Sequence, residues 1–511
     1  MNGIADSTNR HGRICACFLI ACTVLLLLAV RDVSAQQTAS GADSVEERIR
    51  SLTDAMSRVE AQMQESQQEL AELKEQLASL RTSSGLEGTP AAPATESASA
   101  ADLSAAVAEL RETQGVQEAQ ISTLDQSKVE SASKYPLKLS GMILLNGFVN
   151  TREVDAAATP TVALYGSGST GASLRQTVVG IDVSGPRVLG ATTQGDLRLD
   201  MNASASGSGY SGSYALGLVR LRTAHLDMNW NHAQAFFSLD RPLLSPETPS
   251  SLTAVAVPPL AWSGNLWAWN PQAGISYDAA TGSAGSLKIQ AALMDVADPP
   301  RLYPTSPSGA YTPPSTAELS RWPGVEARVA FNGHVEDNAL RMGLSGYFAP
   351  HRISGSTFEF DSWASAADFH VPVFHFSQVS ASAYFGTALG GLGGGAYKDI
   401  VATVSGSEIY YRALDDRGGW AQWKQNAGER LEFNEAFGID SVPAGQLRPY
   451  ATTTPVGEYN LARNRTFTGN VIYSPSAYLL FSLEYRHIMS SCVTAPTMSS
   501  DVIGLGAGYK F

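Results

Sequence analysis

The stretch from Val502 to Phe511 restricts the fold of this chain more than any other part of its sequence. Apolar side chains alternate there with nearly bare positions, so that one face is apolar and the other consists largely of glycine. A period of two is the pattern of a β-strand, and strands of about ten residues with an apolar outer face build transmembrane barrels. A last strand that ends on an aromatic residue is the pattern that the outer-membrane assembly machinery recognises, so Tyr509 and Phe511 are predicted to form the assembly signal.

Earlier segments alternate in the same way and carry charges on their second face. From Leu479 to Tyr485 the odd-numbered residues are apolar or aromatic, whereas Ser482, Glu484 and Arg486 occupy the other side. Comparable segments are 196–202, 325–331 and 340–348, of which the last two are joined by a hairpin across Asn332 to Asn338. An apolar outside with charges inside is the reverse of a soluble barrel. A soluble β-sandwich would alternate too, but it would not require the terminal aromatic residue.

Residues 134–511 are therefore predicted to form an all-β transmembrane barrel of about 16 antiparallel strands, although 14 or 18 strands also fit the length of this domain. The link Ser474–Ser476 is tight and the link Met489–Ser500 is long. This difference predicts short turns at one rim and long loops at the other, with the C-terminus on the short-turn, periplasmic side. A barrel of this size is too wide for side chains to fill, so its geometry favours a water-filled channel.

Residues 1–35 are predicted to be a secretory signal peptide. Arg10 and Arg13 precede an apolar run that ends at Val30, and the small-residue sequence up to Ala35 follows it. A retained N-terminal anchor is the alternative, and lipidation at Cys22 is not expected because the hydrophobic run continues beyond it. Cleavage after Ala35 leaves Cys492 as the only cysteine, which excludes an intrachain disulfide and leaves this thiol without an explanation.

Residues 36–82 are predicted to form a periplasmic coiled coil. Apolar residues from Val45 to Leu80 follow each other in alternating steps of four and three, with Ser66 in one of the positions. Such a stripe would be unstable alone in water, and its strict regularity favours pairing with helices of other copies of the chain. The alternative is an amphipathic helix folded back on its own barrel or on the second helix. A linker rich in Pro, Ala and Ser follows at 83–101, and a second, shorter coiled-coil helix is predicted at 102–133.

The negative charge of the chain belongs mainly to this N-terminal segment. Residues 36–133 hold 7 Lys/Arg and 17 Asp/Glu, whereas residues 134–511 hold 25 and 29. The acidity therefore says little about what the barrel binds. Because there is no basic stripe and the soluble segment is acidic, nucleic-acid binding is not expected. After the signal peptide no stretch of about 18 apolar residues occurs, so a helical membrane protein is excluded.

Alternation places several charged side chains on the lumen side of the barrel. The pore-lining candidates on this ground are Arg198, Arg328, Arg341, Arg486, Glu326 and Glu484. For each of them the alternative is a solvated, balanced lumen charge without a role in selectivity. The segment Pro246–Pro271 is too long for a simple turn and either folds into the lumen or covers the outside, with a slight preference for the inside or the rim. Trp267 and Trp269 are interpreted as part of an aromatic girdle.

Several motifs in the barrel domain resemble the DcaP-like family of trimeric outer-membrane porins. The matching stretches are Gly217–His225, Arg417–Gln422, Leu431–Asn434, Phe437–Asp440, Asn464–Arg465 and Val471–Ser476. The resemblance extends from about residue 137 to the end of the chain and includes the coiled-coil segment. It implies a homotrimer in the bacterial outer membrane, a periplasmic coiled coil, and an arginine-bearing constriction that favours small organic anions such as dicarboxylates.

Only Arg220 and Arg222 are carried over from this resemblance as pore-lining candidates. The polar face that continues through Thr223, His225 and Asp227 would place both arginines on the opposite face unless a bulge intervenes. Either the strand register shifts near Arg222, or these side chains face a contact between subunits.

The function expected from the sequence is a passive diffusion channel for small hydrophilic solutes. An enzyme is not expected, because no Gly-x-Ser-x-Gly, His-Glu-x-x-His or Gly-rich phosphate loop occurs. The histidines have no metal-ligand spacing, so neither a metal nor a cofactor is predicted. The competing hypothesis is a structural outer-membrane anchor with a periplasmic coiled-coil tether and a blocked lumen. Outer-membrane lipids and the barrel-assembly machinery are expected partners under both hypotheses.

Overall fold

The structure is a computed structural model that describes residues 136–203, 218–280, 285–300, 314–335, 338–374, 376–451 and 460–511. The predicted signal peptide, coiled coil, linker and second helix fall outside these described residues. Within the described ranges, no helix is long and apolar enough to cross a membrane.

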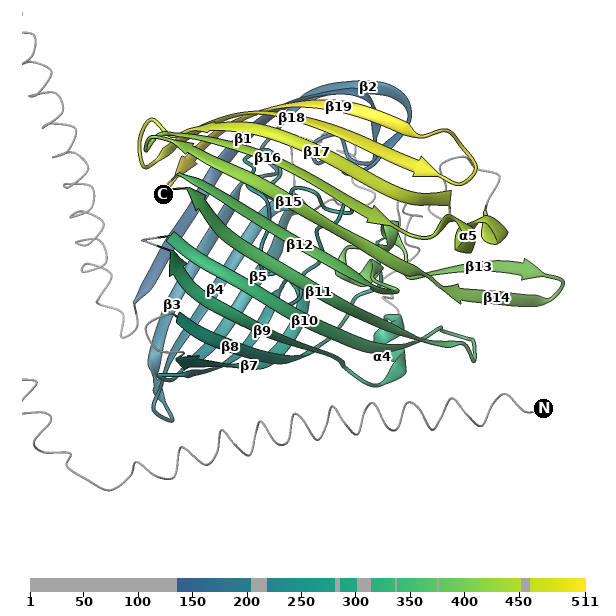
Figure 1. Ribbon diagram of the computed structural model, residues 1–511, viewed down its shortest axis with the longest axis horizontal. Helices are drawn as coiled ribbons and strands as arrows, with labels where there is room; N and C mark the ends of the chain where they lie inside the picture. The colour runs from purple at the N-terminus through teal and green to yellow at the C-terminus, as the bar shows by residue number, and fades with distance from the viewer. Residues whose placement is uncertain are drawn as a thin grey trace, which may run out of the picture. The chain divides into compact units, whose positions relative to one another are not determined.

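Nineteen strands and a few short helices make up the described ranges (Figure 1). The strands are β1 Leu137–Val154, β2 Ala163–Ser173, β3 Val178–Val188, β4 Ala191–Ala203, β5 Leu218–Asn229, β6 Ala233–Asp240, β7 Asn270–Ala280, β8 Gly285–Met294, β9 Gly324–Val335, β10 Asn338–Arg352, β11 Glu359–Phe374, β12 Ser377–Thr387, β13 Ile400–Ser405, β14 Glu408–Ala413, β15 Asp415–Ala427, β16 Leu431–Ser441, β17 Leu461–Tyr473, β18 Leu479–Cys492 and β19 Met498–Lys510. The short helices are α4 Thr316–Ser320, η3 Gly390–Leu392, η4 Gly395–Tyr397, α5 Ala444–Leu447 and η5 Arg448–Tyr450.

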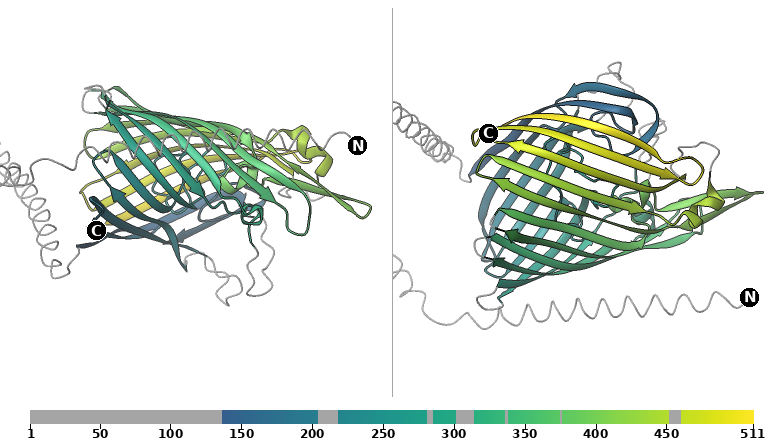
Figure 2. Two further views of the ribbon diagram at one scale, coloured as in Figure 1. Left: turned by 90° about the horizontal axis from the view of Figure 1, so that it is seen from below. Right: turned by 45° about the horizontal axis from the view of Figure 1, so that its top comes forward.

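All strands except β13 and β14 belong to one antiparallel sheet that closes on itself when β1 pairs with β19. On its other side β1 pairs with both β2 and β3, which run in the same direction along it and are separated by Leu174–Thr177. These two strands therefore occupy one position in the wall. The wall curves round into a barrel (Figure 2). Its described strands occupy sixteen positions, which confirms the predicted number.

The two rims of the barrel differ in the length of their connections. At the rim where β1 begins and β19 ends, here called the terminal rim, neighbouring strands are joined by short links such as 336–337 and 428–430. The predicted hairpin at Asn332–Asn338 is one of them. At the opposite rim the links include 241–269, 295–323 and 388–414. The prediction of a long final link was wrong, because β18 continues to Cys492 and β19 begins at Met498.

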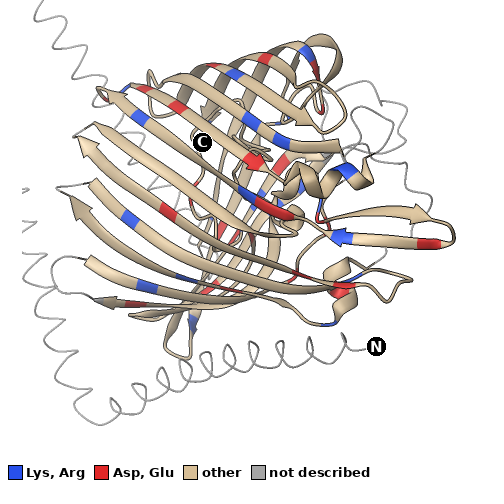
Figure 3. Ribbon diagram, turned by 45° about the vertical axis from the view of Figure 1, so that its right-hand side comes forward, with Lys and Arg blue, Asp and Glu red and all other residues tan. Residues whose placement is uncertain are grey.

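The alternation read from the sequence is the alternation between the outside and the lumen. On β18 the residues Leu483 and Tyr485 are exposed on the outer surface, whereas Glu484 and Arg486 are buried inside. Charged positions are scattered singly along the strands and separated by long uncharged stretches (Figure 3). Large apolar side chains such as Leu483 and Leu505 are exposed on the outer surface, which suits contact with lipid.

Apolar packing fills part of the barrel toward the rim with the long links. One cluster joins Leu244 and Leu266 of segment 241–269 to Tyr347 and Tyr384 of the wall, with Leu389 and Leu392 between them. A second cluster contains Trp262, Tyr397 and the loop residues around them. Segments 241–269 and 388–399 are called the crossing segment and the inner turn from here on.

The crossing segment approaches the wall so closely that the wall requires glycine. A β-carbon added at Gly438 of β16 would lie 2.1 Å from the carbonyl oxygen of Ser263, a backbone atom of the crossing segment. Gly264 faces the same restriction, because its own β-carbon would lie 2.1 Å from the carbonyl oxygen of Gly419, and its φ is +99°. Contacts of this kind position the crossing segment against β15 and β16.

Replacing Gly438 by alanine should therefore displace the crossing segment. We expect Gly438→Ala to lower the free energy of unfolding by about 1–3 kcal/mol, the usual cost of overpacking, as measured by urea unfolding of the refolded barrel. Gly445→Ala is the matched control, because a β-carbon at Gly445 meets no atom within 4 Å. Equal stability of the two variants would contradict the close approach.

Candidate functional site

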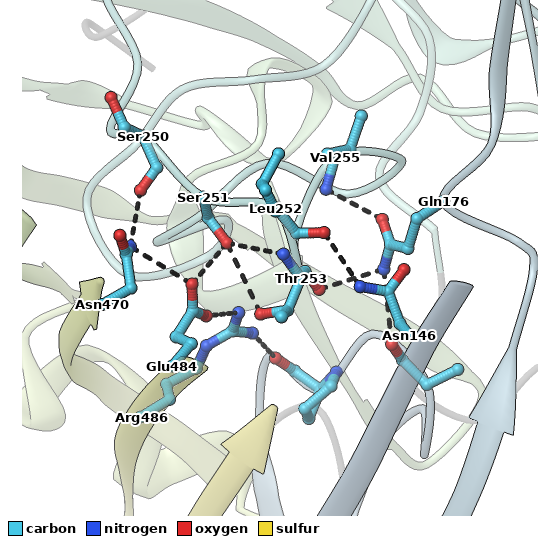
Figure 4. A network of polar contacts seen from close by, with 12 residues as sticks. Asn146, Gln176, Ser250, Ser251, Leu252, Thr253, Val255, Asn470, Glu484 and Arg486 are labelled. Atoms are coloured by element: carbon cyan, nitrogen blue, oxygen red, sulfur yellow. Dashed lines mark hydrogen bonds and ion pairs between the residues drawn. The ribbon is translucent and has the colours of Figure 1, made fainter. Parts of the chain in front are cut away.

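The crossing segment lies inside the barrel, which decides between the two placements left open by the sequence. Polar side chains that point inward from the wall bind its backbone (Figure 4). The amide nitrogen of Asn470 donates to the carbonyl oxygen of Ser250 at 2.8 Å, and that of Asn146 donates to Leu252 at 2.9 Å. Gln176 accepts from the backbone nitrogens of Val255 and Ala256 at 2.8 and 2.7 Å. The segment is thus held from β17, β1 and the link between β2 and β3.

Glu484 and Arg486 point into the lumen, and both hold loops in place. A carboxylate oxygen of Glu484 accepts from the guanidinium of Arg486 at 2.6 Å, and the other accepts from the hydroxyl of Ser251. Arg486 also donates to the carbonyl oxygen of Pro160 at 3.0 Å. These two residues therefore link the wall to the crossing segment and to the loop after β1.

Three further predicted residues are bound in a similar way. Arg328 forms a bidentate pair with Asp368, at 2.6 and 3.1 Å, and both side chains are buried. Glu326 is buried and accepts from the backbone nitrogen of Leu243 at 2.7 Å. Arg341 lies 3.1 Å from Glu247 of the crossing segment. The two arginine–carboxylate pairs add little net field to the lumen.

Arg220 and Arg222 reach the lumen through a bulge, which was one of the two alternatives derived from the sequence. The pairing of β4 with β5 shifts between Arg198 and Leu199. Arg198 pairs with Thr223 and Leu199 pairs with Leu221, which leaves Arg222 as the extra residue of the bulge. Trp269 then lies under both guanidinium groups. Its ring centre is 5.0 Å from the guanidinium carbon of Arg220 and 5.3 Å from the guanidinium carbon of Arg222. Cations over an aromatic face are attracted to it.

The two arginines differ in how their charge is balanced. Arg220 is bidentate to Asp200, at 2.7 and 3.1 Å, and donates to the carbonyl oxygen of Ala256 at 2.9 Å. Among the described residues, no carboxylate lies within ion-pair distance of Arg222. Arg241 likewise has no carboxylate within ion-pair distance in the ranges that the structure describes. Its guanidinium donates to the carbonyl oxygens of Pro246 and Glu247 at 3.0 and 3.1 Å.

A cavity of about 970 Å³ lies on the terminal-rim side of the crossing segment. Of the described residues that line it, five are basic and three are acidic: Arg198, Arg222, Arg241, Arg430 and Lys510 against Asp240, Glu429 and Glu432. Arg198 is paired with Asp182 on the neighbouring strand. The cavity wall is therefore more cationic than the composition of the barrel. No group of three or more side chains that could hold a metal ion occurs in the described ranges.

The sequence reasoning missed Arg241 and assigned two tryptophans wrongly. Trp267 and Trp269 do not form part of an outer girdle, because they lie in the lumen and pack edge to face with ring centres 5.5 Å apart. Trp267 in turn packs against Trp262 at 6.0 Å. The proline-rich composition of 246–271 was a signal for an inward segment, but periodicity cannot assign the side chains of an irregular segment to a face.

The inner turn is held by three buried carboxyl groups. Asp399 accepts from the backbone nitrogen of Gly390 at 2.6 Å, Asp416 from Gly395 at 2.6 Å and Asp440 from Ala396 at 3.0 Å. Ala396 and Tyr397 are both in the left-handed region, with φ values of 46° and 71°. Such backbone strain persists only where the surroundings over-determine it.

Burial raises the pKa of Asp399 to about 8, against an ordinary value near 4. The unfolded chain thus releases this proton at a lower pH than the folded chain, so the contribution to stability is complete below about pH 4 and is lost as pH rises toward 8. We expect the free energy of unfolding of the wild type to fall over this range relative to Asp399→Asn, and to level off above it. Parallel pH profiles of the two proteins in urea unfolding would contradict the raised pKa.

Comparison with known proteins supports the fold. No model of a protein family matches the chain, and no curated protein matches it either. Among solved structures, the outer membrane channel DcaP of Acinetobacter baumannii is similar with a TM-score of 0.54 at 14% identity, covering 74% of this chain and 97% of that one. The anion-selective porin from Comamonas acidovorans has a TM-score of 0.44 at 9% identity, covering 74% of this chain and 100% of that one. Salmonella typhi OmpF, in a complex with daunomycin, has a TM-score of 0.43 at 12% identity, with 74% and 98% covered. The described part of this chain thus has the fold of the outer membrane channel DcaP, and the resemblance read from the sequence holds at the level of the fold.

Proposed function

We propose that this protein is an outer-membrane porin, a passive diffusion channel for small hydrophilic solutes with a preference for organic anions such as dicarboxylates. The observation that carries the proposal is the cationic cavity beside the crossing segment, in which Arg222 and Arg241 have no carboxylate partner among the described residues. The sixteen-strand wall with its apolar outside supports the location in the outer membrane.

Several finer parts of this proposal come from the sequence. The protein would be a homotrimer with its coiled coil in the periplasm, delivered by the barrel-assembly machinery through a signal at Tyr509 and Phe511. Among the pore-lining candidates, the proposal assigns selectivity to Arg222 and treats Arg198, Arg220, Arg328, Arg341 and Arg486 as balanced charges, since each has a carboxylate partner. Glu326 and Glu484 hold the crossing segment.

The second candidate function is a structural anchor with a blocked lumen. It is favoured by the apolar clusters that fill part of the barrel around the crossing segment and the inner turn. The two candidates make opposite predictions for conductance, because a blocked barrel carries no current.

The test is the reversal potential of single channels in a salt gradient across planar bilayers. One unpaired cation about 7 Å away favours a passing anion and disfavours a passing cation by about 0.6 kcal/mol each in water. Arg222→Ala and Arg241→Ala should therefore each lower the anion-to-cation permeability ratio about sevenfold. Arg352→Ala is the matched control. This arginine is exposed at the end of β10, at the rim with the long links, and it does not line the cavity.

The outcomes separate the two functions. Anion preference that decreases in both lumen variants and persists in Arg352→Ala supports the channel. A folded, intact oligomer that never conducts would instead favour the anchor. Conductance without anion preference would retain the porin and remove the role of the two arginines.

A further inference from the structure

Four aromatic side chains form a continuous series from the inner turn to the arginines of the lumen. Tyr397 stacks on Trp262 with ring centres 4.0 Å apart and an angle of 20° between the rings. Trp262 contacts Trp267, and Trp267 contacts Trp269, both edge to face. Trp269 lies under Arg220 and Arg222. The series therefore connects two loops that are more than a hundred residues apart in the sequence.

Tyr397 is fixed at its far end by polar contacts. Its hydroxyl donates to a carboxylate oxygen of Asp155 at 2.9 Å and contacts the hydroxyl of Thr161. Asp155 also accepts from the backbone nitrogens of Thr161 and Val162, at 2.7 and 2.9 Å, so the loop after β1 is rigid where Tyr397 meets it. One side chain thus joins this loop, the inner turn and the crossing segment.

The turn that carries Tyr397 is held by the wall as well as by the crossing segment, whose Ala268 nitrogen donates to the carbonyl oxygen of Leu392 at 3.2 Å. Asp416 and Asp440, which belong to the wall strands β15 and β16, bind the backbone of Gly395 and Ala396 directly before Tyr397. The tyrosine is therefore fastened to the wall through its backbone. The crossing segment around Trp262 is fastened to the wall by Asn464, which donates to the carbonyl oxygen of Trp262 at 3.0 Å.

We infer that Tyr397 is a positioning residue for the channel, which holds the crossing segment through Trp262 and thereby places Trp269 beneath Arg222. Aromatic pairs of this geometry contribute beyond the area that they bury, and a binding constellation needs its side chains held in place by packed neighbours. The inference rests on the proposed channel, and it adds the inner turn as a second element that determines the width and selectivity of the lumen.

The experiment combines one readout that needs no conduction with one that does. The first is the rate at which a thiol reagent labels Ala261→Cys in a Cys492→Ala background, because Ala261 is 2% exposed in the same cluster as Tyr397 and Trp262. The second is the conductance and reversal potential of single channels. Both are measured on the full chain, in which Cys15, Cys17 and Cys22 are also replaced by alanine. The variants are Tyr397→Ala, Tyr397→Phe and the matched control Tyr410→Ala, an exposed tyrosine of β14.

Tyr397→Ala should label about tenfold faster, which corresponds to about 1.4 kcal/mol, and should show larger, noisier current with a reduced anion preference. Tyr397→Phe retains the stacked ring and should restore most of the selectivity while labelling at an intermediate rate. Tyr410→Ala should match the wild type. A Tyr397→Ala channel with unchanged labelling and unchanged reversal potential would overturn the inference.

Two further outcomes keep this inference apart from the proposed function. If the wild type never conducts but Tyr397→Ala labels faster, the channel is refuted, and the role of Tyr397 in holding the crossing segment remains supported. If Tyr397→Ala does not fold, Tyr397→Phe decides: a labelling rate equal to that of the wild type would sink the inference, and a faster rate would support it.

Discussion

The structure depends on one constraint, which is that an irregular backbone inside a barrel must find hydrogen-bond partners in the wall. The crossing segment has no regular secondary structure, so its carbonyl and amide groups need side chains to satisfy them. Asn146, Gln176 and Asn470 provide these contacts from three parts of the wall (Figure 4). The polar lumen face is therefore determined as much by the needs of this segment as by the passage of water.

The same constraint explains why most charged side chains of the lumen are paired with another charge or bound to a loop. Arg486, Glu484 and Glu326 hold loops, and Arg328 is neutralised by Asp368. A charge that is paired and hydrogen-bonded is fixed in place and contributes little field at a distance, because its partner cancels it. Alternation in the sequence identifies all of these residues as inward-facing, but it does not distinguish a structural pair from a free cation.

What the sequence could predict follows from which patterns are local. The faces of β18 and β19 follow from a period of two, which persists wherever strands are regular. The strand number follows from the length of the domain, and the short-turn rim follows from the lengths of the links. The bulge at Arg222 was left as an alternative, because one extra residue reverses the face and nothing local marks it. The positions of Trp267 and Trp269 were wrong, since they depend on Tyr397 and Trp262, which meet them only in the folded lumen.

The charge of Arg222 bears on whether the lumen is blocked. Removing a guanidinium from water without a partner costs several kcal/mol, and the bulge that exposes Arg222 would not persist in a dry, filled barrel. The cavity of about 970 Å³ beside it has room for many water molecules, each of which occupies about 30 Å³. Apolar clusters fill the region around the inner turn, whereas Arg198, Arg222 and Arg241 line the cavity. The packed part holds the crossing segment in place, and under the proposed function the cavity beside Arg222 is the path of the solute.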